Sequence, residues 1–367
     1  MRHLEGPLNS LSSCRASVQG SLPAIEFLVI TEMAAGRRRS FDFAADTKID
    51  RNQERAFRER LEVFILEQVA QFEPEIRDQV NTCLQAGGKR IRPTLLNRAA
   101  FAGQSEVCPD LVKASAVVEL VHVATLVHDD VLDEAILRRS SSTLYSDEGA
   151  KVAVLVGDAL FSHALRLAAE FPTTDICAWV SEATRRTCAG ETRQTLQKGK
   201  LNLSLENYYR IIELKTAELF RVSCLIGAFL GGFEKAFCNA SSTFGLRLGI
   251  AYQLFDDLAD LFGDEFRFGK TLGTDWMNRK PTLPLILLLR ELDSKVAEDL
   301  WGTKETDVEE IRTMFNEREL FETCVDRIRA ELASAESALA DFLNLRPVPL
   351  LLEAIPYMER KLSELKP

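Results

Sequence analysis

The chain has 367 residues, of which 46% are hydrophobic and 27% charged, so it is long and apolar enough to bury a sizeable core. Its formal net charge of −10 argues against a nucleic-acid partner, because phosphates would be repelled everywhere except at local basic patches. Its eight cysteines are scattered without a CxxC pair, which favours free thiols in a reducing compartment, and we expect the cytoplasm.

The N-terminal stretch differs in composition from the rest of the chain, because it is rich in serine and carries sparse charge. An organellar transit peptide is one interpretation, but Glu5 and Glu26 fit it poorly. We expect either a disordered extension or a translation start at Met33. The predicted organisation is an extension over residues 1–50, followed by one domain over residues 51–367.

After this extension, the sequence predicts one helix after another. Apolar residues recur at helical spacing in RAFRERLEVFILEQVAQF (55–72), which is typical of an amphipathic helix. The segments 114–130, 153–169 and 246–262 are apolar on most faces and should be central helices. The polar segment 262–284 is a candidate functional loop. The sequence therefore predicts an all-α fold, a large single-domain helical bundle, with no apolar run long enough to span a bilayer.

The stretch LVHDDVLDEA (126–135) places three carboxylates directly after an apolar run. Asp129 and Asp133 are four residues apart and share one helical face, with Asp130 beside them. Burying these like charges without compensation would be unfavourable or would force protonation. A cation removes the conflict, and Mg²⁺ prefers carboxylate and phosphate oxygens. For this cluster taken alone, a helix end where acids meet solvent is the alternative.

The same D-D-x-x-D spacing recurs at the end of a second apolar helix, in Asp256, Asp257 and Asp260. Two such helices facing each other would wall a central cavity with carboxylates, and helical bundles often hold metals between facing helices. A di-iron centre is another metal interpretation, but it uses Glu and Glu-x-x-His, and no such pair accompanies these aspartates. The recurrence therefore favours a magnesium site over a solvated helix end.

Cationic groups that suit an anion occur in three nearby segments. The motif GGKRIRP (87–93) can end a helix at its glycines and gather basic residues on a short turn, although a surface basic turn is the alternative. Arg138 and Arg139 follow the first aspartate cluster, and arginine forks suit phosphate. His122 lies two helical turns before Asp129, where a core histidine is the alternative. The basic residues of the turn are Lys89, Arg90 and Arg92.

Five motifs follow one another along the chain: GGKRIRP, HDDVLDEAILRR, LKTAE, YQLFDDLAD and GKTLGTDWMNRKPTLP. In this order they resemble the trans-isoprenyl diphosphate synthases. The resemblance covers roughly residues 55–367 and is strongest over 80–290. The chain departs from the family pattern at 140–145, where a Gly and then Pro-Thr are usual. It also has Arg279 and Lys280 in place of a Gly-Lys pair.

The resemblance implies a homodimer that elongates an isoprenoid chain, with three Mg²⁺ ions per active site when substrate is bound. The C–O bond of an allylic diphosphate ionises, the alkene of isopentenyl diphosphate attacks the allylic cation, and a proton leaves. The implied metal ligands are Asp129, Asp133 and Asp256, and their secondary ligands or support are Asp130, Asp257 and Asp260. The residues implied around the allylic diphosphate are Arg138, Lys215, Thr216, Gln253 and Lys270. The residues implied to hold isopentenyl diphosphate are Lys89, Arg92, His122 and Arg139.

Product length is expected to depend on the helix that leads into the first aspartate cluster. Ala124 and Thr125 are small, whereas short-chain members of the family tend to place an aromatic ring in this neighbourhood as a floor. Ala124, Val121 and Val117 share one face that would line a tunnel for the growing chain. A tight helix–helix contact is the alternative for Ala124. We expect a long-chain all-trans polyprenyl diphosphate, with geranylgeranyl or farnesyl diphosphate as the alternative product.

Two further functions remain as alternatives. A terpene cyclase also uses aspartate-bound Mg²⁺ on a helical bundle, but it binds no second diphosphate and would not need GGKRIRP. A non-catalytic subunit of a heteromeric prenyltransferase tends to have eroded aspartate clusters, whereas both clusters are intact here. For the enzyme itself we expect no nucleic acid, no transmembrane segment, and delivery of the product to a membrane.

Overall fold

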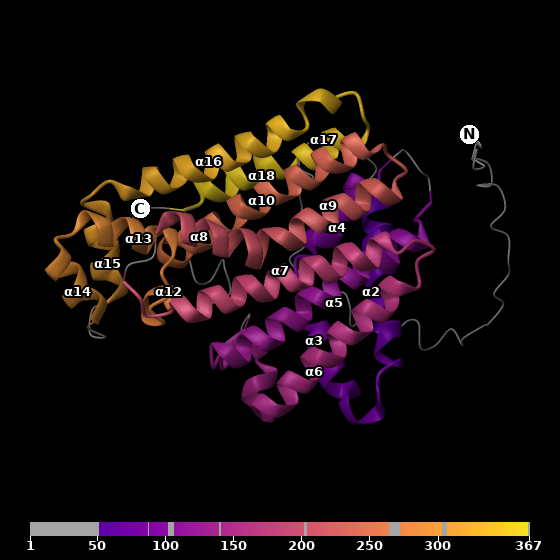
Figure 1. The fold of residues 1–367 in the computed structure, drawn as a ribbon, viewed down its shortest axis with the longest axis horizontal. Coiled ribbons are helices and arrows are strands. Elements are labelled where there is room, and N and C mark those ends of the chain that lie inside the picture. Colours follow the sequence, from indigo (N-terminus) through magenta and orange to yellow (C-terminus); the bar gives the residue numbers. More distant parts are fainter. Residues whose placement is uncertain are drawn as a thin grey trace, which may run out of the picture. The chain divides into compact units, whose positions relative to one another are not determined.

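The computed structural model describes residues 51–86, 88–101, 106–138, 141–201, 204–263, 272–302 and 307–365. Within these ranges nearly every element is a helix (Figure 1). The longer helices are α2 (Arg51–Val69), α5 (Pro109–Leu132), α6 (Leu144–Ala169), α7 (Asp175–Gln197), α9 (Glu218–Leu230), α10 (Lys235–Phe262) and α16 (Leu320–Ala338). The predicted all-α fold is confirmed. The predicted extension, residues 1–50, lies outside the described residues.

Shorter elements complete the described part of the chain. The short α-helices are α3 (Arg77–Gln85), α4 (Ile91–Ala99), α8 (Leu205–Ile212), α12 (Thr274–Met277), α13 (Leu283–Glu291), α14 (Ser294–Gly302), α15 (Val308–Asn316), α17 (Pro347–Leu352) and α18 (Ala354–Ser363). The 3-10 turns are η1 (Pro74–Ile76) and η3 (Ala340–Phe342), and η2 (Glu213–Ala217) is a π-helical turn. The strands β1 (Leu137–Arg138) and β2 (Ser141–Ser142) pair antiparallel, with Leu137 opposite Ser142.

Helix α9 joins the two hydrophobic clusters of the interior. On one side of it α5 packs along α6, and on the other side α10 packs between α9 and α16 (Figure 1). Phe220 and Cys224 of α9 belong to the cluster around α10, whereas Leu219, Val222 and Ile226 belong to the cluster around α5. A helix that is apolar on most faces can be buried on both sides. The two helices that carry the aspartate clusters are therefore held in one core.

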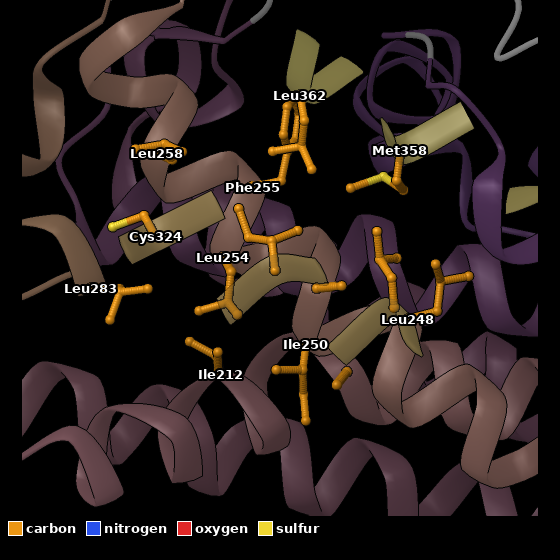
Figure 2. Packing of buried hydrophobic residues seen from close by; sticks show 14 of the residues in the cluster. Ile212, Leu248, Ile250, Leu254, Phe255, Leu258, Leu283, Cys324, Met358 and Leu362 are labelled. Carbon is orange, nitrogen blue, oxygen red and sulfur yellow. The ribbon is translucent and has the colours of Figure 1, made fainter. Parts of the chain in front are cut away.

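Helix α10 is fixed along its length by apolar packing (Figure 2). Its residues Leu254, Phe255 and Leu258 are almost completely buried. The surrounding side chains come from other helices, and Figure 2 labels Leu283, Cys324, Met358 and Leu362 among them. Because close-packed interiors leave side chains little freedom, this packing fixes the helix end at which the second aspartate cluster lies.

Local sequence signals explain where the helices around the first aspartate cluster begin. Pro109 occupies the first turn of α5, where its missing N–H is not needed. Thr143 caps α6 by accepting a hydrogen bond from the backbone N–H of Ser146 at 3.0 Å. Between them, α5 ends at Asp133 and the β1–β2 hairpin reverses the chain, so α6 returns along α5. The described residues on either side of positions 139–140 are therefore held by the strand pairing and by the Thr143 cap.

The expectation that no apolar run is long enough to span a bilayer was wrong, because α5 and α6 pass that test by length and composition. In α5, 72% of the most apolar window is buried, which is the burial of a core helix. In α6 only 44% of that window is buried. Core helices of soluble proteins share the length and composition of membrane spans, so these two helices are weak evidence for a membrane protein. The partial burial of α6 does leave apolar side chains on its outer face.

Candidate active site

The first aspartate cluster lies at the end of α5, beside a lysine from the π-helical turn η2. The Nζ atom of Lys215 is 3.5 Å from Asp129 Oδ2, donates to Gln194 Oε1 at 2.7 Å, and pairs with Glu191. Burial and the nearby charge of Asp129 raise the pKa of Glu191. Two carboxylates thus share one ammonium group, which leaves negative charge that a further cation would offset.

The other two aspartates of this cluster have different surroundings. Asp130 is buried and accepts a hydrogen bond from Arg138 Nε at 2.7 Å. Burial raises the pKa of Asp130, although Arg138 acts in the opposite direction. Asp133 caps the C-terminus of α5, is exposed, and lies 3.4 Å from Lys198 Nζ. Asp130 therefore orients an arginine that was predicted to bind diphosphate. Asp133 stays accessible to solvent at the end of α5.

The second aspartate cluster also divides into buried and accessible members. Asp257 and Asp260 are 3% and 2% exposed, whereas Asp256 is only half-buried. Asp260 accepts hydrogen bonds from Thr274 Oγ1 at 3.1 Å and from the backbone N–H of Asp275 at 3.0 Å. Its carboxylate therefore fixes the start of α12. These hydrogen bonds hold the carboxylate of Asp260 in place, and its predicted role as a secondary metal ligand or support stays a prediction.

Asp257 belongs to a hydrogen-bonded chain that ends at Thr216. It accepts from Tyr208 Oη at 2.6 Å and from Gln253 Nε2 at 2.7 Å, and Gln253 Oε1 accepts from Thr216 Oγ1 at 2.6 Å. The bond from its Nε2 to Asp257 fixes the amide orientation of Gln253, so its carbonyl oxygen faces Thr216. The Thr216 hydroxyl consequently gives its proton to Gln253 and keeps its lone pairs for the pocket.

The segment after α12 supplies a half-buried lysine. Lys280 Nζ lies 3.1 Å from Asp275 Oδ1. Burial alone would lower the pKa of Lys280, but Asp275 and Asp257 beside it raise the pKa above its ordinary value. Arg279 has a left-handed backbone (φ 50°), a conformation that favours glycine, and its guanidinium lies 4.1 Å over the ring of Trp276. The departure from the family's Gly-Lys pair therefore falls on a strained position that an aromatic contact supports.

Lys215 and Thr216 both lie on η2, which is wedged between two helices. A Cβ atom at Gly190 of α7 would lie 2.5 Å from the backbone nitrogen of Lys215. A Cβ atom at Gly249 of α10 would lie 2.6 Å from Cα of Ala217. Side chains at either glycine would push the turn away, so both glycines allow the backbones to approach. Single-turn π segments are rare and frequently occur at functional sites.

A pocket joins these groups. It lies between α7, α8, η2, α10 and the segment before α13. Lys215, Thr216, Gln253, Asp257 and Lys280 line it. The pocket thus has an ammonium group on the side of Asp129 and a hydroxyl on the side of α10.

The aspartates fit a magnesium ion chemically, although they do not form a closed cage. Among the residues that the structure describes, no three His, Cys, Asp or Glu side chains are grouped so as to hold a metal ion by themselves. Mg²⁺ is commonly bound by one or two carboxylates, with water and phosphate oxygens filling the remaining positions. Asp129 and Asp256 are half-buried and Asp133 is exposed, so an ion can approach them more easily than the buried Asp130, Asp257 and Asp260. Their role as metal ligands stays a prediction.

The basic residues predicted to bind isopentenyl diphosphate have unequal surroundings. Lys89 is exposed, and the half-buried Arg92 has its guanidinium 4.9 Å over the ring of Phe220. Arg90 is instead a structural residue, because it is buried and pairs with Glu119 at 2.6 Å and with Glu62 of α2. Burial of a charge is tolerated when it is paired in this way.

The histidine and the chain-length residues lie along α5. His122 is half-buried, and its backbone carbonyl accepts from Thr125 Oγ1 at 2.7 Å. Ala124, Val121 and Val117 are buried in the cluster around α5. This burial is compatible with a tunnel wall and with a tight helix contact, so the tunnel stays a prediction. Two other predicted residues, Arg139 and Lys270, lie outside the described residues.

Sequence reasoning missed four residues of the site: Glu191, Gln194, Tyr208 and Lys280. A local signal exists for the first two, because Glu191 and Gln194 lie at i and i+3 and share one face of α7. No such signal connects Tyr208 with Asp257, since the contact joins residues 49 positions apart.

Comparisons with known proteins identify the family of this chain. A family model described as polyprenyl synthetase matches residues 73–318. Octaprenyl diphosphate synthase of Haemophilus influenzae is 32% identical over 265 residues, which cover 70% of this chain and 79% of that protein. Heptaprenyl diphosphate synthase component 2 of Geobacillus stearothermophilus is 36% identical over 234 residues, which cover 64% of this chain and 72% of that protein.

Solved structures of polyprenyl diphosphate synthases have the same fold as this chain. A polyprenyl synthase of Caulobacter crescentus, complexed with calcium and isoprenyl diphosphate, has a TM-score of 0.77 at 31% identity, covering 84% of this chain and 95% of that one. A decaprenyl diphosphate synthase of Rhodobacter capsulatus has a TM-score of 0.76 at 28% identity, covering 85% of this chain and 97% of that one. Family model, sequence relatives and fold agree with the ordered motifs, so the chain belongs to the polyprenyl synthetase family and is a trans-isoprenyl diphosphate synthase, an all-α prenyltransferase.

Proposed function

We propose that this enzyme condenses isopentenyl diphosphate with an allylic diphosphate, repeatedly and with 1'-4 linkage, to give a long-chain all-trans polyprenyl diphosphate. The observation that carries the proposal is the position of η2. Lys215 contacts Asp129 of the first cluster, and the next residue, Thr216, bonds to Gln253, which is one helical turn before Asp257. One turn of helix thus links both aspartate helices around one pocket.

The roles of the side chains follow from where charge develops. The allylic C–O bond breaks, and negative charge grows on the leaving diphosphate. Lys215 is placed beside Asp129 to stabilise that charge, and Arg138 is oriented by Asp130 for the same purpose. Asp129, Asp133 and Asp256 would hold Mg²⁺, three ions per site in the substrate complex, and these ions would neutralise diphosphate charge.

The alkene of isopentenyl diphosphate then forms the new C–C bond with the allylic carbon, and the released diphosphate accepts the proton that is lost. Lys89, Arg92, His122 and Arg139 would hold the second diphosphate. The lone pairs that Thr216 keeps for the pocket suit a neighbouring carbocation. Small residues at Ala124 and Thr125 leave the family's floor position open, which supports a long product. The relatives named octaprenyl and decaprenyl diphosphate synthases support the same product class.

We further propose that the enzyme is a homodimer whose copies meet at the outer face of α6. Val154 and Leu155 on that face are 41% and 63% exposed. Exposed apolar patches on helices commonly mark protein interfaces. Assembly with a different subunit is the alternative, since relatives from two bacilli are named component 2 of a heptaprenyl diphosphate synthase. We expect the enzyme to work in the cytoplasm and to deliver its product to a membrane.

Incubating the purified chain with Mg²⁺, isopentenyl diphosphate and each allylic primer in turn tests the function. Chromatographic sizing of the dephosphorylated products should show all-trans chains longer than geranylgeraniol. Diphosphate release from an allylic primer without isopentenyl diphosphate would instead indicate a terpene cyclase. No product from the chain alone, with activity after a second subunit is added, would indicate the heteromeric alternative. A product no longer than farnesol would contradict the long-chain assignment.

A further inference from the structure

The π-helical turn η2 stands between two ordinary helices, α8 and α9. Backbone conformations that are rarely populated persist when the surrounding structure holds them in place. The residues of η2 itself, Glu-Leu-Lys-Thr-Ala, are ordinary helix formers with no glycine or proline among them. The cause of the turn must therefore lie in contacts made by its neighbours.

Arg186 of α7 contacts both ends of this turn. Its Nη2 donates to Glu213 Oε1 at 3.1 Å, and its Nε lies 2.9 Å from Glu218 Oε2. Glu213 opens η2, and Glu218 is the first residue after it. One guanidinium group therefore joins two carboxylates that are five positions apart in sequence.

This spacing distinguishes a π turn from an α-helical turn. In an α-helix each residue rotates by about 100°, so side chains five positions apart are separated by about 140° around the axis. A π turn pairs residue i with residue i+5, which brings such side chains onto one face. One guanidinium group can pair with both carboxylates only when they share a face, here through a hydrogen bond to Glu213 and an ion pair with Glu218. The contacts of Arg186 therefore favour the π turn over a continuous α-helix.

Both carboxylates have a second arginine partner. Glu218 is fully buried, and its Oε1 accepts from Arg221 Nε at 2.9 Å and Nη2 at 2.6 Å. Glu213 accepts from Arg210 Nη1 at 2.6 Å. Removing Arg186 would consequently leave neither carboxylate without a cation. The chain should still fold, and the contact that is lost is the one that joins the two ends of η2.

The turn that Arg186 clamps carries Lys215 and Thr216. These two side chains face different helices, since Lys215 contacts Asp129 of α5 and Gln194 of α7, whereas Thr216 donates to Gln253 of α10. Gly190, one helical turn after Arg186 on α7, lets the backbone of Lys215 approach. A change from π to α register would rotate Lys215 and Thr216 relative to α8 and disturb both sets of contacts.

We propose that Arg186 is a positioning residue, which acts through Glu213 and Glu218 to keep η2 in the π conformation and so to place Lys215 and Thr216 for the ionisation step. This inference rests on the proposed function. Arg186 itself touches no substrate group in the proposed mechanism. Its removal should therefore lower the rate of the chemical step and leave the capture of substrates nearly unchanged.

The neighbouring Arg185 offers a matched control, because its exposed side chain pairs with the exposed Glu182 on the surface of α7. For R186A we expect kcat to fall on the order of tenfold to a hundredfold, as small displacements of catalytic groups do, with KM for both diphosphates within about twofold of wild type. R186K should be intermediate, because an ammonium group keeps the positive charge but lacks the planar fork whose separate nitrogens reach Glu213 and Glu218. R185A should retain wild-type kcat.

A double-mutant cycle with E213Q tests whether the bridge is the cause. E213Q removes the same bridge from its other end, so the double variant R186A/E213Q should be no slower than R186A alone. Additive losses in kcat would overturn the proposal, and so would an R186A variant whose kcat lies within about twofold of R185A. An effect on KM with unchanged kcat would overturn it as well.

Separate measurements distinguish a folding defect in a variant from a loss of its activity. Circular dichroism and thermal unfolding report whether each variant is folded, and if R186A does not fold, R186K and E213Q decide the question by the same kcat criterion. Wild-type kcat in both of these folded variants would overturn the proposal. If wild type and R185A both fail to condense the substrates, the proposed function fails, whereas active R186 variants refute only the role of Arg186.

Discussion

Asp256 and Asp257 are adjacent in sequence and carry the same carboxyl group, yet their surroundings separate their roles. Asp257 is buried, and burial together with Asp275 raises its pKa to about 7. Both of its oxygens accept hydrogen bonds from side chains, whereas Asp256 is half-buried at the helix surface. A sequence pattern of three aspartates cannot show this division, because donors such as Tyr208 come from another helix.

Substituting Tyr208 tests whether its hydrogen bond to Asp257 matters for stability and activity. Tyr208→Phe keeps the buried ring but removes the hydroxyl that donates to Asp257, leaving a buried acceptor unpaired at a cost of about 1–3 kcal/mol in the free energy of unfolding. Gln253 then holds Thr216 less firmly, so we expect kcat to fall on the order of tenfold.

Chemical denaturation and steady-state kinetics check both effects of Tyr208→Phe. Tyr209→Phe is the matched control, because Tyr209 is half-buried beside Tyr208 and does not bond to Asp257 in the described contacts. Equal losses of kcat in the two variants would show that the chain from Tyr208 to Thr216 has no special role.

His163 gives the fold a dependence on pH. It is buried on α6, bonds to Gln68, and has its pKa lowered to about 4, mainly by burial and further by Arg166, with Glu170 opposing. The unfolded chain, with a pKa near 6.5, binds this proton more tightly than the folded chain. The free energy of unfolding should therefore fall as the pH drops from about 6.5 towards 4, by up to about 3 kcal/mol.

His163→Gln removes this titration and can still donate to Gln68. Denaturant unfolding at about pH 7 and about pH 4.5 should show a smaller loss of stability for the variant than for wild type. The same loss in both proteins would assign the acid sensitivity to other groups.

Among the elements, the long helices could be predicted because their signal is local. The apolar segments 114–130 and 246–262 fall within α5 and α10, and the aspartate spacing placed each cluster at a helix end. The π turn could not be predicted, because its residues suit an α-helix and its cause is a side chain on α7. Likewise, the sequence marked Arg90 as a phosphate-binding candidate, although distant glutamates make it a structural residue.

Helix α7 and the turn η2 approach each other so closely at Gly190 that a larger side chain there should disturb both. In Gly190→Ala the new Cβ atom would lie 2.5 Å from the backbone nitrogen of Lys215, so one of the two elements must move. Overpacking of this kind typically costs about 1–3 kcal/mol. We expect a lower unfolding midpoint and a lower kcat, because Lys215 moves with its backbone.

Gly302→Ala is the control for the glycine change, because a Cβ atom at Gly302 meets nothing within 4 Å. It should keep wild-type kcat and leave stability unchanged or slightly higher, as alanine favours helices. If Gly190→Ala behaved like Gly302→Ala in both assays, η2 would have more room than the structure indicates.

The two hydrophobic clusters hold the helices that carry the site. They bury only part of the apolar surface of α6. Its inner face packs on α5, and its outer face exposes Val154 and Leu155. The most apolar window of α6 has the same mean hydropathy as that of α5 but is much less buried. A surface of this kind is expected to be covered in the working enzyme, and we have proposed a second copy of the chain as its partner.

Leu155→Glu tests this assembly. In a dimer with two-fold symmetry the same patch occurs on both subunits, so one substitution places two carboxylates in a single apolar interface. Desolvating these charges is unfavourable, and we expect the dissociation constant of the dimer to rise by at least about tenfold. Light scattering coupled to size-exclusion chromatography, over a dilution series, should show a dimer for wild type and a shift towards monomer for the variant.

Leu343→Glu controls for adding a charge at an exposed leucine, since Leu343 is 62% exposed and follows η3, away from α6 in sequence and in packing. It should remain dimeric. A monomeric wild type would exclude the homodimer, and a Leu155→Glu variant that dimerises as tightly as wild type would place the interface elsewhere. If the variant becomes monomeric and also loses activity while circular dichroism shows an intact fold, the dimer is needed to hold α5, and with it Asp129, in its working position.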